Sequence, residues 1–377
     1  MSGTTGPSAR SRPRRLGRLR AALGLGLATA LLALAPAAQA GPSHPANAYH
    51  QTNLVSDVAG LAQLTDPDLV NPWGLAAGPA TPIWVADNGT GKATIYPGFV
   101  HGSPIQKAAL VVDIPGGAPT GQVFNGTPGF VVRSGAASGP GVFLFDSEAG
   151  LVTGWNPNVP PPAPSTQAEV GTPVRNAIYK GLAIATTPAG TFLYGADFHH
   201  GRIDVFDDGY HRVRLPGRFQ DPRLPRGYAP FNVQELGGRL YVAYAKQDAD
   251  REDEVAGPGR GFVDVYSTGG HLLRRLVRRG QLDAPWGLAQ APTSGFGRFS
   301  GDLLVGNFGD GRINAYDPMT GAFRGRLRHE DGSPVEIEGL WGLRFGNGVT
   351  GDPTTLLFSA GIDDEAHGLF GAIQAAS

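Results

Sequence analysis

An Asp or Asn that is followed four residues later by Gly recurs along this chain of 377 residues. At each copy the Asp or Asn ends an apolar segment and begins a turn. If the turns lie around a common axis, their oxygens form a ring, and Ca²⁺ prefers about six to eight oxygen ligands. The sequence therefore offers calcium as a candidate cofactor. The candidate metal ligands are Asp87, Asp146, Asp197, Asn307 and Asp364.

The same positions have an explanation that requires no ligand. An Asp or Asn at the start of a turn accepts hydrogen bonds from nearby backbone N–H groups. A residue that is repeated in nearly every unit is also more typical of a structural role than of ligand binding, because a ligand-binding site is asymmetric. We expect turn capping to be the main role of the five, and function to lie where single copies depart from the pattern. These departures are His199, His200, Asp363, Glu365 and His367, together with Glu148 and the acidic insertion 246–254.

The histidines offer the most chemistry among these departures. A His side chain can bind a transition metal or act as a base near neutral pH. His199 and His200 are adjacent, so their side chains point in different directions and are poorly placed to share one metal ion. His367 lies with the acids at 363–365 in a second polar cluster. Neither group has the spacing of a zinc motif, and no serine-hydrolase, zinc-protease or phosphate-loop motif occurs in a suitable context.

The turns belong to a repeat of about 55 residues. Residues 196–207 align without gaps with residues 306–317, and a further copy begins at 86. Further turns of the same form begin at 146 and 364. The copy expected near 250 is missing, because the acidic insertion stands in place of the turn. The chain therefore contains six units.

Each unit contains signals for four short strands. The first strand reads Trp-Gly-Leu in three units, and an apolar strand, the Asp-x-x-x-Gly turn and two more strands follow. Four strands repeated six times predict an all-β fold, a six-bladed β-propeller with four-stranded blades. Gly after Trp would let the inner strands approach the axis, with the Trp packed between adjacent blades. The inner strands are expected at 72–76, 128–131, 180–183, 230–233, 285–289 and 340–343.

The two ends of the chain predict how the ring closes. The last unit stops after its third strand, 369–374, and an unpaired strand signal, 49–55, precedes the first unit. We expect the N-terminal strand to become the outer strand of the last blade, which protects an edge. In a propeller, the turns after the second strands and the loops before the inner strands share one face. Asn71, Asn125, Asp283 and Glu338 are expected in those loops.

Residues 1–40 read as a signal peptide, with six Arg, an apolar stretch at 21–35 and the sequence Ala-Gln-Ala at 38–40. Residues 41–48 would be a linker and 49–377 a single propeller domain. The apolar stretch is short for a membrane span, so we expect an exported monomer, periplasmic or extracellular, with no membrane span after cleavage. The sequence has no Cys, which excludes disulfides and a Cys nucleophile.

The charge of the exported part argues against nucleic acid as a partner. The whole chain has a net charge of −1, and without the six Arg of residues 1–40 the charge is −7. The densest Arg cluster lies at 274–279. We interpret it as the solvated side of an outer strand, where charges discourage edge pairing; phosphate binding is the weaker alternative.

Several motifs resemble known propeller families. Sequences such as Gly-Arg-Ile-x-Val-Phe-Asp are similar to the NHL-repeat class of six-bladed propellers. A closer resemblance is to a family of exported bacterial proteins without an assigned activity, and it covers nearly all of the chain after the signal. The resemblance implies the fold and export, and it implies no catalytic residues. The matching segments are 53–57, 71–75, 85–89 and 359–371.

The sequence favours a binding or scaffold protein that presents polar loops around a central funnel. Its partner would be a protein, a carbohydrate or another small molecule. The alternative is a metal-dependent hydrolase or lactonase that acts at the funnel, as in other six-bladed propellers, but that reasoning depends on fold analogy. A quinone- or flavin-linked oxidation has no cofactor fingerprint to support it.

Overall fold

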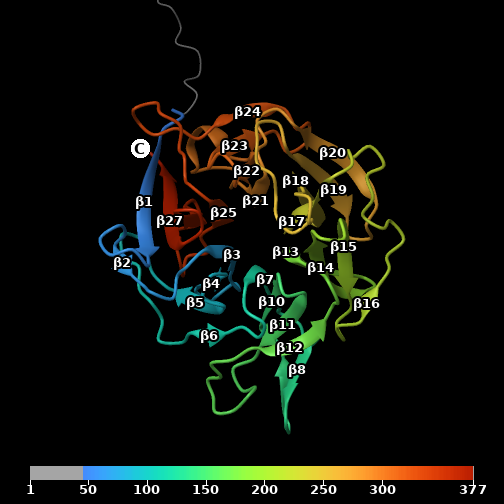
Figure 1. Cartoon of the computed structure of the whole chain (residues 1–377). Coiled ribbons are helices and arrows are strands. Elements are labelled where there is room, and N and C mark those ends of the chain that lie inside the picture. The colour runs from blue at the N-terminus through green and yellow to red at the C-terminus, as the bar shows by residue number, and fades with distance from the viewer. Residues whose placement is uncertain (1–45, 377) are drawn as a thin grey trace, which may run out of the picture. The chain divides into compact units, whose positions relative to one another are not determined.

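The computed structural model describes residues 46–376. The signal peptide expected at 1–40 and the first part of the linker therefore lie outside the described residues. Six sheets surround a central axis (Figure 1), and the fold is the six-bladed β-propeller that the repeat predicts. The part of the chain that the structure describes has one helical turn, the 3-10 turn Gly297–Phe299, and has no helix long and apolar enough to cross a membrane.

The blades follow one another along the chain, and each runs from an inner strand at the axis to an outer strand at the rim. Blade 1 contains β3 (Pro72–Ala76), β4 (Ile83–Asp87), β5 (Lys92–Tyr96) and β6 (Val112–Asp113). Blade 2 contains β7 (Pro119–Phe124), β10 (Phe143–Ser147), β11 (Leu151–Trp155) and β12 (Glu169–Pro173). Blade 3 contains β13 (Tyr179–Thr187), β14 (Gly190–Asp197), β15 (Arg202–Phe206) and β16 (Arg212–Val213).

The second half of the ring has the same organisation. Blade 4 contains β17 (Tyr228–Leu236), β18 (Arg239–Lys246), β19 (Phe262–Ser267) and β20 (Leu272–Arg278). Blade 5 contains β21 (Pro285–Gln290), β22 (Leu303–Asn307), β23 (Ile313–Tyr316) and β24 (Phe323–Arg326). Blade 6 contains β25 (Leu340–Phe345), β26 (Leu356–Ile362), β27 (His367–Ala375) and β1 (Tyr49–Ser56), with β2 (Leu64–Thr65) pairing in parallel with β1.

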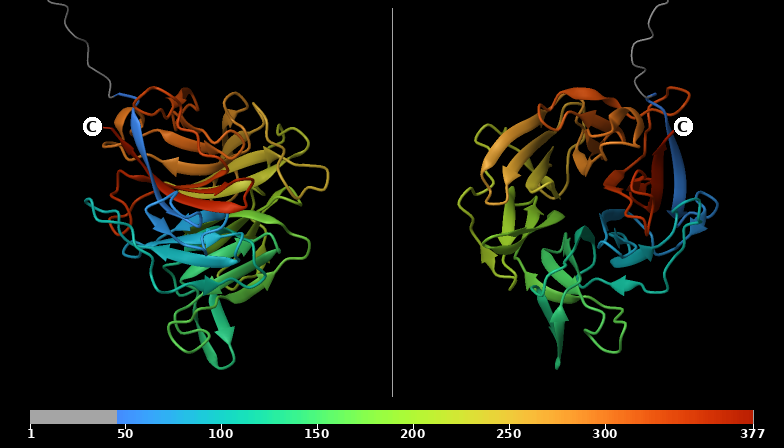
Figure 2. Two further views of the ribbon diagram at one scale, coloured as in Figure 1. Left: turned by 60° about the vertical axis from the view of Figure 1, so that its left-hand side comes forward. Right: turned by 180° about the vertical axis from the view of Figure 1, so that it is seen from behind.

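The N-terminal strand closes the ring as predicted. β1 pairs antiparallel with β27 from Tyr49 opposite Ala375 to Ser56 opposite Leu369 (Figure 2). Tyr49 is 1% exposed, and its ring lies 5.0 Å from that of Phe296 in the neighbouring blade. A ladder of backbone hydrogen bonds and an aromatic contact therefore join the first strand to the last blade without a disulfide.

Blade 2 departs from the sequence prediction. Its inner strand is β7, whereas residues 128–131 lead into an inserted hairpin of β8 (Val131–Ser134) and β9 (Ala137–Pro140). β7 reads Pro-Thr-Gly-Gln, so it has the glycine of an inner strand without the Trp. Asn125 consequently follows an inner strand and does not precede one, and its side-chain amide donates to the carbonyl of Gly141 at 2.8 Å.

The glycines of the inner strands allow the close approach that their position predicts. A Cβ on Gly74 would lie 2.5 Å from the carbonyl oxygen of Thr120 in the next inner strand, and one on Gly342 would lie 2.5 Å from that of Trp73. Contacts this short exclude any side chain. Neighbouring inner strands are thus packed backbone to backbone at the axis.

Candidate functional site

Aromatic side chains fill the axis next to the inner strands. The rings of Trp73 and Trp341 stack with centroids 3.5 Å apart, and Trp286 meets Trp73 edge-on at 6.0 Å. Trp341 thus contacts the tryptophans of both adjacent blades, as expected, and the contact of Trp73 with Trp286 additionally joins two blades that are not neighbours. The inner strands approach one another so closely that bulky side chains pointing to the axis meet each other. The same cluster includes Phe198 and Phe231.

One position of the inner strands supplies most of this axial layer. This position is the one directly before the Gly-Leu sequence of the strand. It is occupied by Trp73, Trp286 and Trp341 in three blades and by Lys180 in β13. Blade 3 thus places an ammonium group where three other blades place an indole. Thr120 and Phe231 occupy the position in the remaining two inner strands.

A cavity of about 680 Å³ lies above the axial aromatic cluster. It opens on the face that carries the turns after the second strands, as the sequence predicts. We call it the axial pocket. Five acids and one lysine surround an aromatic floor, and the acidic insertion between β18 and β19 supplies three of the acids. The lining residues are Trp73, Ile178, Lys180, Phe308, Trp341, Glu148, Glu252, Asp253, Glu254 and Glu365.

Lys180 is the central polar group of the axial pocket. Its side chain is 2% exposed, and its Nζ donates to Glu148 Oε1 at 2.5 Å and to Asp253 Oδ1 at 3.1 Å. The Nζ also lies 5.3 Å from the ring centre of Trp73, in the range of a cation–π contact. Burial acts to lower the pKa of Lys180, but the charges and hydrogen bonds of Glu148 and Asp253 outweigh it and raise the pKa above its ordinary value. Lys180 is therefore an ammonium ion.

Besides the exposed Glu252, two half-buried acids of the pocket lack a cation in the described part of the chain. Across residues 46–376, neither Glu254 nor Glu365 forms an ion pair. Glu365 Oε2 accepts a hydrogen bond of 2.6 Å from the side-chain amide of Asn71. Burial raises the pKa of Glu365, and the charges of neighbouring acids add to the effect. Burial likewise raises the pKa of Glu254 to about 7.

Asn71 links the acids to the aromatic floor. Its Oδ1 accepts a hydrogen bond of 3.0 Å from the indole N–H of Trp341, while its amide donates to Glu365. The backbone of Asn71 is left-handed, with φ of 45°, a conformation that Asn tolerates better than most residues. This one side chain therefore fixes both the orientation of a floor residue and the position of an unpaired acid.

Of the five funnel residues expected from the sequence, the structure brings only Glu365 into the axial pocket. Asp363 lies in the turn between β26 and β27 with φ of 56° and does not line the pocket. The three histidines also lie outside it. His200 Nδ1 is 2.8 Å from Asp197 Oδ2, and His367 Nδ1 is 2.6 Å from Asp57 Oδ2. His199 does not line the pocket either, and its ring packs edge-on to that of His200.

The five proposed metal ligands belong to five separate turns. Asp146 accepts hydrogen bonds from the Thr120 hydroxyl at 3.0 Å and from the Gly121 N–H at 2.7 Å. Asp197 accepts from the N–H of His200, in keeping with turn capping. Within residues 46–376, no three His, Cys, Asp or Glu side chains are grouped so that they could hold a metal ion. Calcium binding by Asp87, Asp146, Asp197, Asn307 and Asp364 stays a prediction.

Sequence reasoning missed Lys180, Asp253 and Glu254 as individual site residues. A signal for Lys180 was present, because it replaces Trp in the sequence Trp-Gly-Leu. The acidic insertion was recognised as a departure from the repeat, but its length alone does not show that it bends over the axis. That placement depends on the loop between β18 and β19, in which Val255 donates to the Lys246 carbonyl at 2.7 Å.

The fold and the axial pocket define a six-bladed propeller with an acidic, aromatic funnel. No family model matches the chain. Two uncharacterized proteins of Acanthamoeba polyphaga mimivirus are similar to it. One is 35% identical, with 88% of this chain and 82% of the relative covered. The other is 33% identical, with 88% of this chain and 87% of the relative covered. The chain belongs to the family of these mimivirus proteins, and these relatives do not support the expectation of a bacterial family.

Solved structures agree with the fold at low sequence identity. An α-L-arabinanase of Penicillium chrysogenum, complexed with arabinobiose, has a TM-score of 0.51 and 12% identity, with 86% of this chain and 98% of that chain covered. An identity this low shows similarity of fold alone.

Proposed function

We propose that this protein is an exported binding protein that holds a small organic cation in the axial pocket. The observation that carries the proposal is the pair of half-buried acids, Glu254 and Glu365, that have no cation partner within residues 46–376. Burial is the main cause that raises the pKa of both acids, and the charges of neighbouring acids add to it, so their ionised forms are incompletely stabilised. A bound ammonium or guanidinium group would supply the missing positive charge.

The aromatic floor supports the same ligand class. Lys180 already demonstrates that an ammonium is stable between carboxylates and over the face of Trp73. Phe308 stacks on Trp341 with centroids 4.1 Å apart and also lines the pocket. Aromatic faces attract cations at short range, so a second cation beside Glu254 and Glu365 would have the environment that the first one has.

Isothermal titration at low salt with putrescine and choline tests the proposal. We expect binding of at least one of these amines, weakened about tenfold by Glu254→Gln or Glu365→Gln because a charge-assisted hydrogen bond is lost. Binding should also release protons near pH 7, since a cation lowers the raised pKa of Glu254. Proton release is measured by repeating the titration in buffers with different ionisation enthalpies.

A matched control separates the pocket from general charge. Glu330→Gln makes the same change at an exposed position that does not line the pocket, and it should leave amine binding unchanged. Arabinobiose and CaCl₂ serve as neutral-carbohydrate and metal-ion probes. Binding of arabinobiose without amine binding, or equal loss in Glu330→Gln and Glu254→Gln, would contradict the proposed cation site.

Hydrolysis at the funnel is the second candidate, and Glu254 is the observation that favours it. A carboxyl group with a pKa of about 7 is half protonated at neutral pH and suits general acid catalysis. Glu148 and Glu365 line the same pocket and could act as the base. Because no three acids or histidines of residues 46–376 are grouped around one point, we derive no step through a metal ion. Lactone and aryl-glycoside hydrolysis, assayed with and without EDTA, tests this candidate; no turnover in either assay would contradict it.

A further inference from the structure

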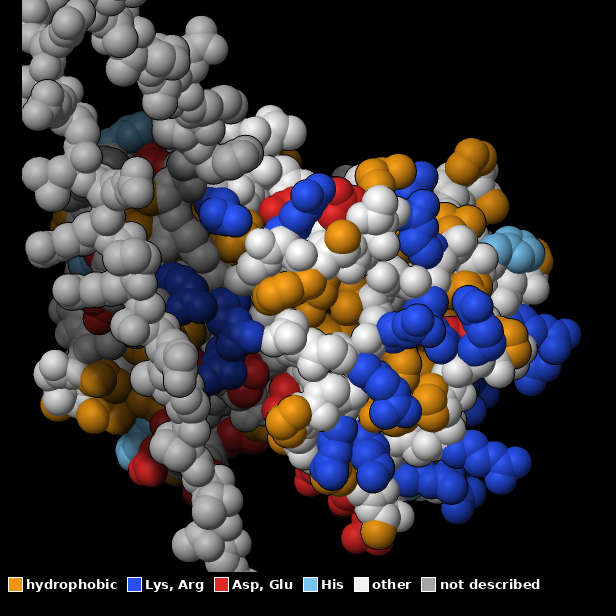
Figure 3. Space-filling view, turned by 90° about the horizontal axis from the view of Figure 1, so that it is seen from above, with side chains coloured by type: hydrophobic (Ala, Val, Ile, Leu, Met, Phe, Trp, Pro, Cys, Tyr) orange, Lys and Arg blue, Asp and Glu red, His pale blue; other side chains and the backbone are white. Residues whose placement is uncertain are grey.

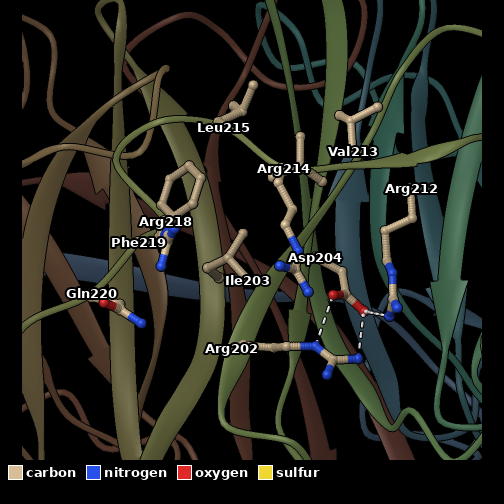
Figure 4. A pocket seen from close by; sticks show the side chains of 11 residues that line it. Arg202, Ile203, Asp204, Arg212, Val213, Arg214, Leu215, Arg218, Phe219 and Gln220 are labelled. Atoms are coloured by element: carbon tan, nitrogen blue, oxygen red, sulfur yellow. Dashed lines mark hydrogen bonds and ion pairs between the residues drawn. The ribbon is translucent and has the colours of Figure 1, made fainter.

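A second cavity, of about 460 Å³, lies at the outer part of blade 3 (Figure 4). We call it the arginine pocket. Four arginines surround it with a single acid among them, and the rest of the lining is mainly apolar. The lining residues are Arg202, Arg212, Arg214, Arg218, Asp204, Ile203, Val205, Val213, Leu215, Phe219 and Gln220.

The pocket exists because the outer strand of blade 3 is short. β16 pairs with β15 only at Val205 and Phe206, so the first three residues of β15 have no neighbour in an outer strand. β16 ends at Val213, and Pro216 beyond it has no N–H to donate to the ladder. Residues 214–220 therefore form a wall beside β15 and leave a hollow between the two.

The wall is anchored to blade 4. The N–H of Gly217 donates to Gly269 and the N–H of Phe219 donates to Gly270, both at 3.0 Å. Phe219 is 6% exposed and packs against the rings of Tyr194 and Tyr266 at 5.7 and 5.4 Å. The pocket is thus bounded by packed residues on both sides.

Positive charge is in surplus inside the arginine pocket. Asp204 pairs with Arg202 at 2.8 Å and with Arg212 at 3.5 Å, so one acid is shared by two arginines. Across residues 46–376, Arg214 and Arg218 form no ion pair. In Figure 4, Arg202, Arg212 and Arg214 point toward the same part of the pocket as Asp204.

The backbone at the mouth of the pocket adopts an unusual conformation. Arg218 and Phe219 have φ values of 59° and 52°. Left-handed backbone is uncommon for such residues and costs free energy. The conformation buries the Phe219 ring while the side chain of Arg218 stays exposed in the lining of the pocket.

The surroundings strengthen the positive potential. Arg274 and Arg278 of β20 are exposed on the neighbouring blade. Lys and Arg side chains also gather on the right of Figure 3, the side on which β20 lies. Charge of one sign around a hollow raises the local concentration of counter-ions. The sequence-based interpretation of this region as a solvated strand face therefore omits a concave site next to it.

We propose that the arginine pocket binds an organic anion. The phosphate or carboxylate group of the ligand pairs with Arg214 or Arg218, and an apolar part of the same ligand contacts Ile203, which is drawn between these two arginines in Figure 4. The planar guanidinium of Arg presents paired donors that match the oxygens of such groups. The site is separate from the axial pocket and carries the opposite charge.

Titration calorimetry with phenyl phosphate, phenylacetate, inorganic phosphate and benzyl alcohol tests the proposal. Phenyl phosphate or phenylacetate should bind more tightly than inorganic phosphate, because only they fill the apolar part, and benzyl alcohol should not bind. Comparison of the first two distinguishes phosphate from carboxylate as the preferred group. Arg214→Gln and Arg218→Gln should each weaken binding about fivefold, as expected for a partly exposed ion pair.

The control is Arg133→Gln, which makes the same charge change at an exposed residue of the β8–β9 hairpin outside the pocket. It should leave binding unchanged, and Arg214→Lys should retain part of the affinity because it keeps the charge and loses the paired donors. Equal weakening by Arg133→Gln would show non-specific attraction and overturn the proposal. Equal affinities for phenyl phosphate and inorganic phosphate would also overturn it. The same holds if the folded wild-type protein binds none of the anions.

Discussion

The substitution Glu254→Gln should change how stability depends on pH. Glu254 has a folded-state pKa of about 7, compared with an ordinary value of 4.5. The folded protein therefore holds this proton more tightly than the unfolded chain does. Stability from this group is fully present below pH 4.5 and is lost as pH rises toward 7.

The size of the effect follows from the same two pKa values. A tenfold change in proton affinity corresponds to about 1.4 kcal/mol, so ionising Glu254 at pH 8 destabilises the folded state by at most about 3.5 kcal/mol. Solvent reaches part of this side chain and screens the charge, which leaves about 2 kcal/mol. A glutamine does not ionise, so the Glu254→Gln protein should gain about 2 kcal/mol relative to the wild type between pH 4.5 and pH 8.

Guanidinium denaturation at several pH values between 4.5 and 8 measures this difference. The fluorescence of the tryptophans reports unfolding, because Trp73, Trp286 and Trp341 are packed at the axis. The control Glu330→Gln alters an exposed acid and should follow the wild type at every pH. If the difference in unfolding free energy between Glu254→Gln and the wild type does not change with pH, the electrostatic description of the axial pocket is wrong.

Three substitutions test the packing of the ring by chemical denaturation. Tyr49→Ala should cost about 3 kcal/mol, because it removes a buried ring at the closure; an unchanged midpoint would contradict closure by β1. Gly121→Ala should cost about 1 to 3 kcal/mol, since its Cβ would lie 2.1 Å from the Leu182 nitrogen; wild-type stability would refute that close approach. Arg275→Met should cost about 3 to 5 kcal/mol by leaving buried Asp221 without its cation, whereas Arg274→Met should cost little.

Much of the fold could be predicted from the sequence because its signals are local. The Asp-x-x-x-Gly turns and the Trp-Gly-Leu strands each lie within a few residues, and their spacing counts six units. The pairing of β1 with β27 followed from an incomplete last unit. The error at 128–131 arose where the inner strand has Thr in place of Trp, so the local signal was absent.

The candidate site was only partly predictable. The face of the funnel and Glu365 followed from the turn positions, and His199, His200, His367 and Asp363 shared that face without reaching the pocket. A repeat identifies which end of a blade a residue occupies, but it does not give the distance from the axis. That distance decides which polar side chains meet.

By itself, the sequence determined the number of blades, the closure of the ring and the strand order of every blade but the second, because hydrophobic alternation and turn chemistry act over short segments. Only the tertiary structure decided that Lys180, Glu148 and Asp253 share one pocket. It also decided that the four arginines of blade 3 surround another. Ring closure brings residues from different blades to one axis, and a short outer strand opens a hollow beside its neighbour. Both are consequences of packing between segments distant in sequence, which no local pattern records.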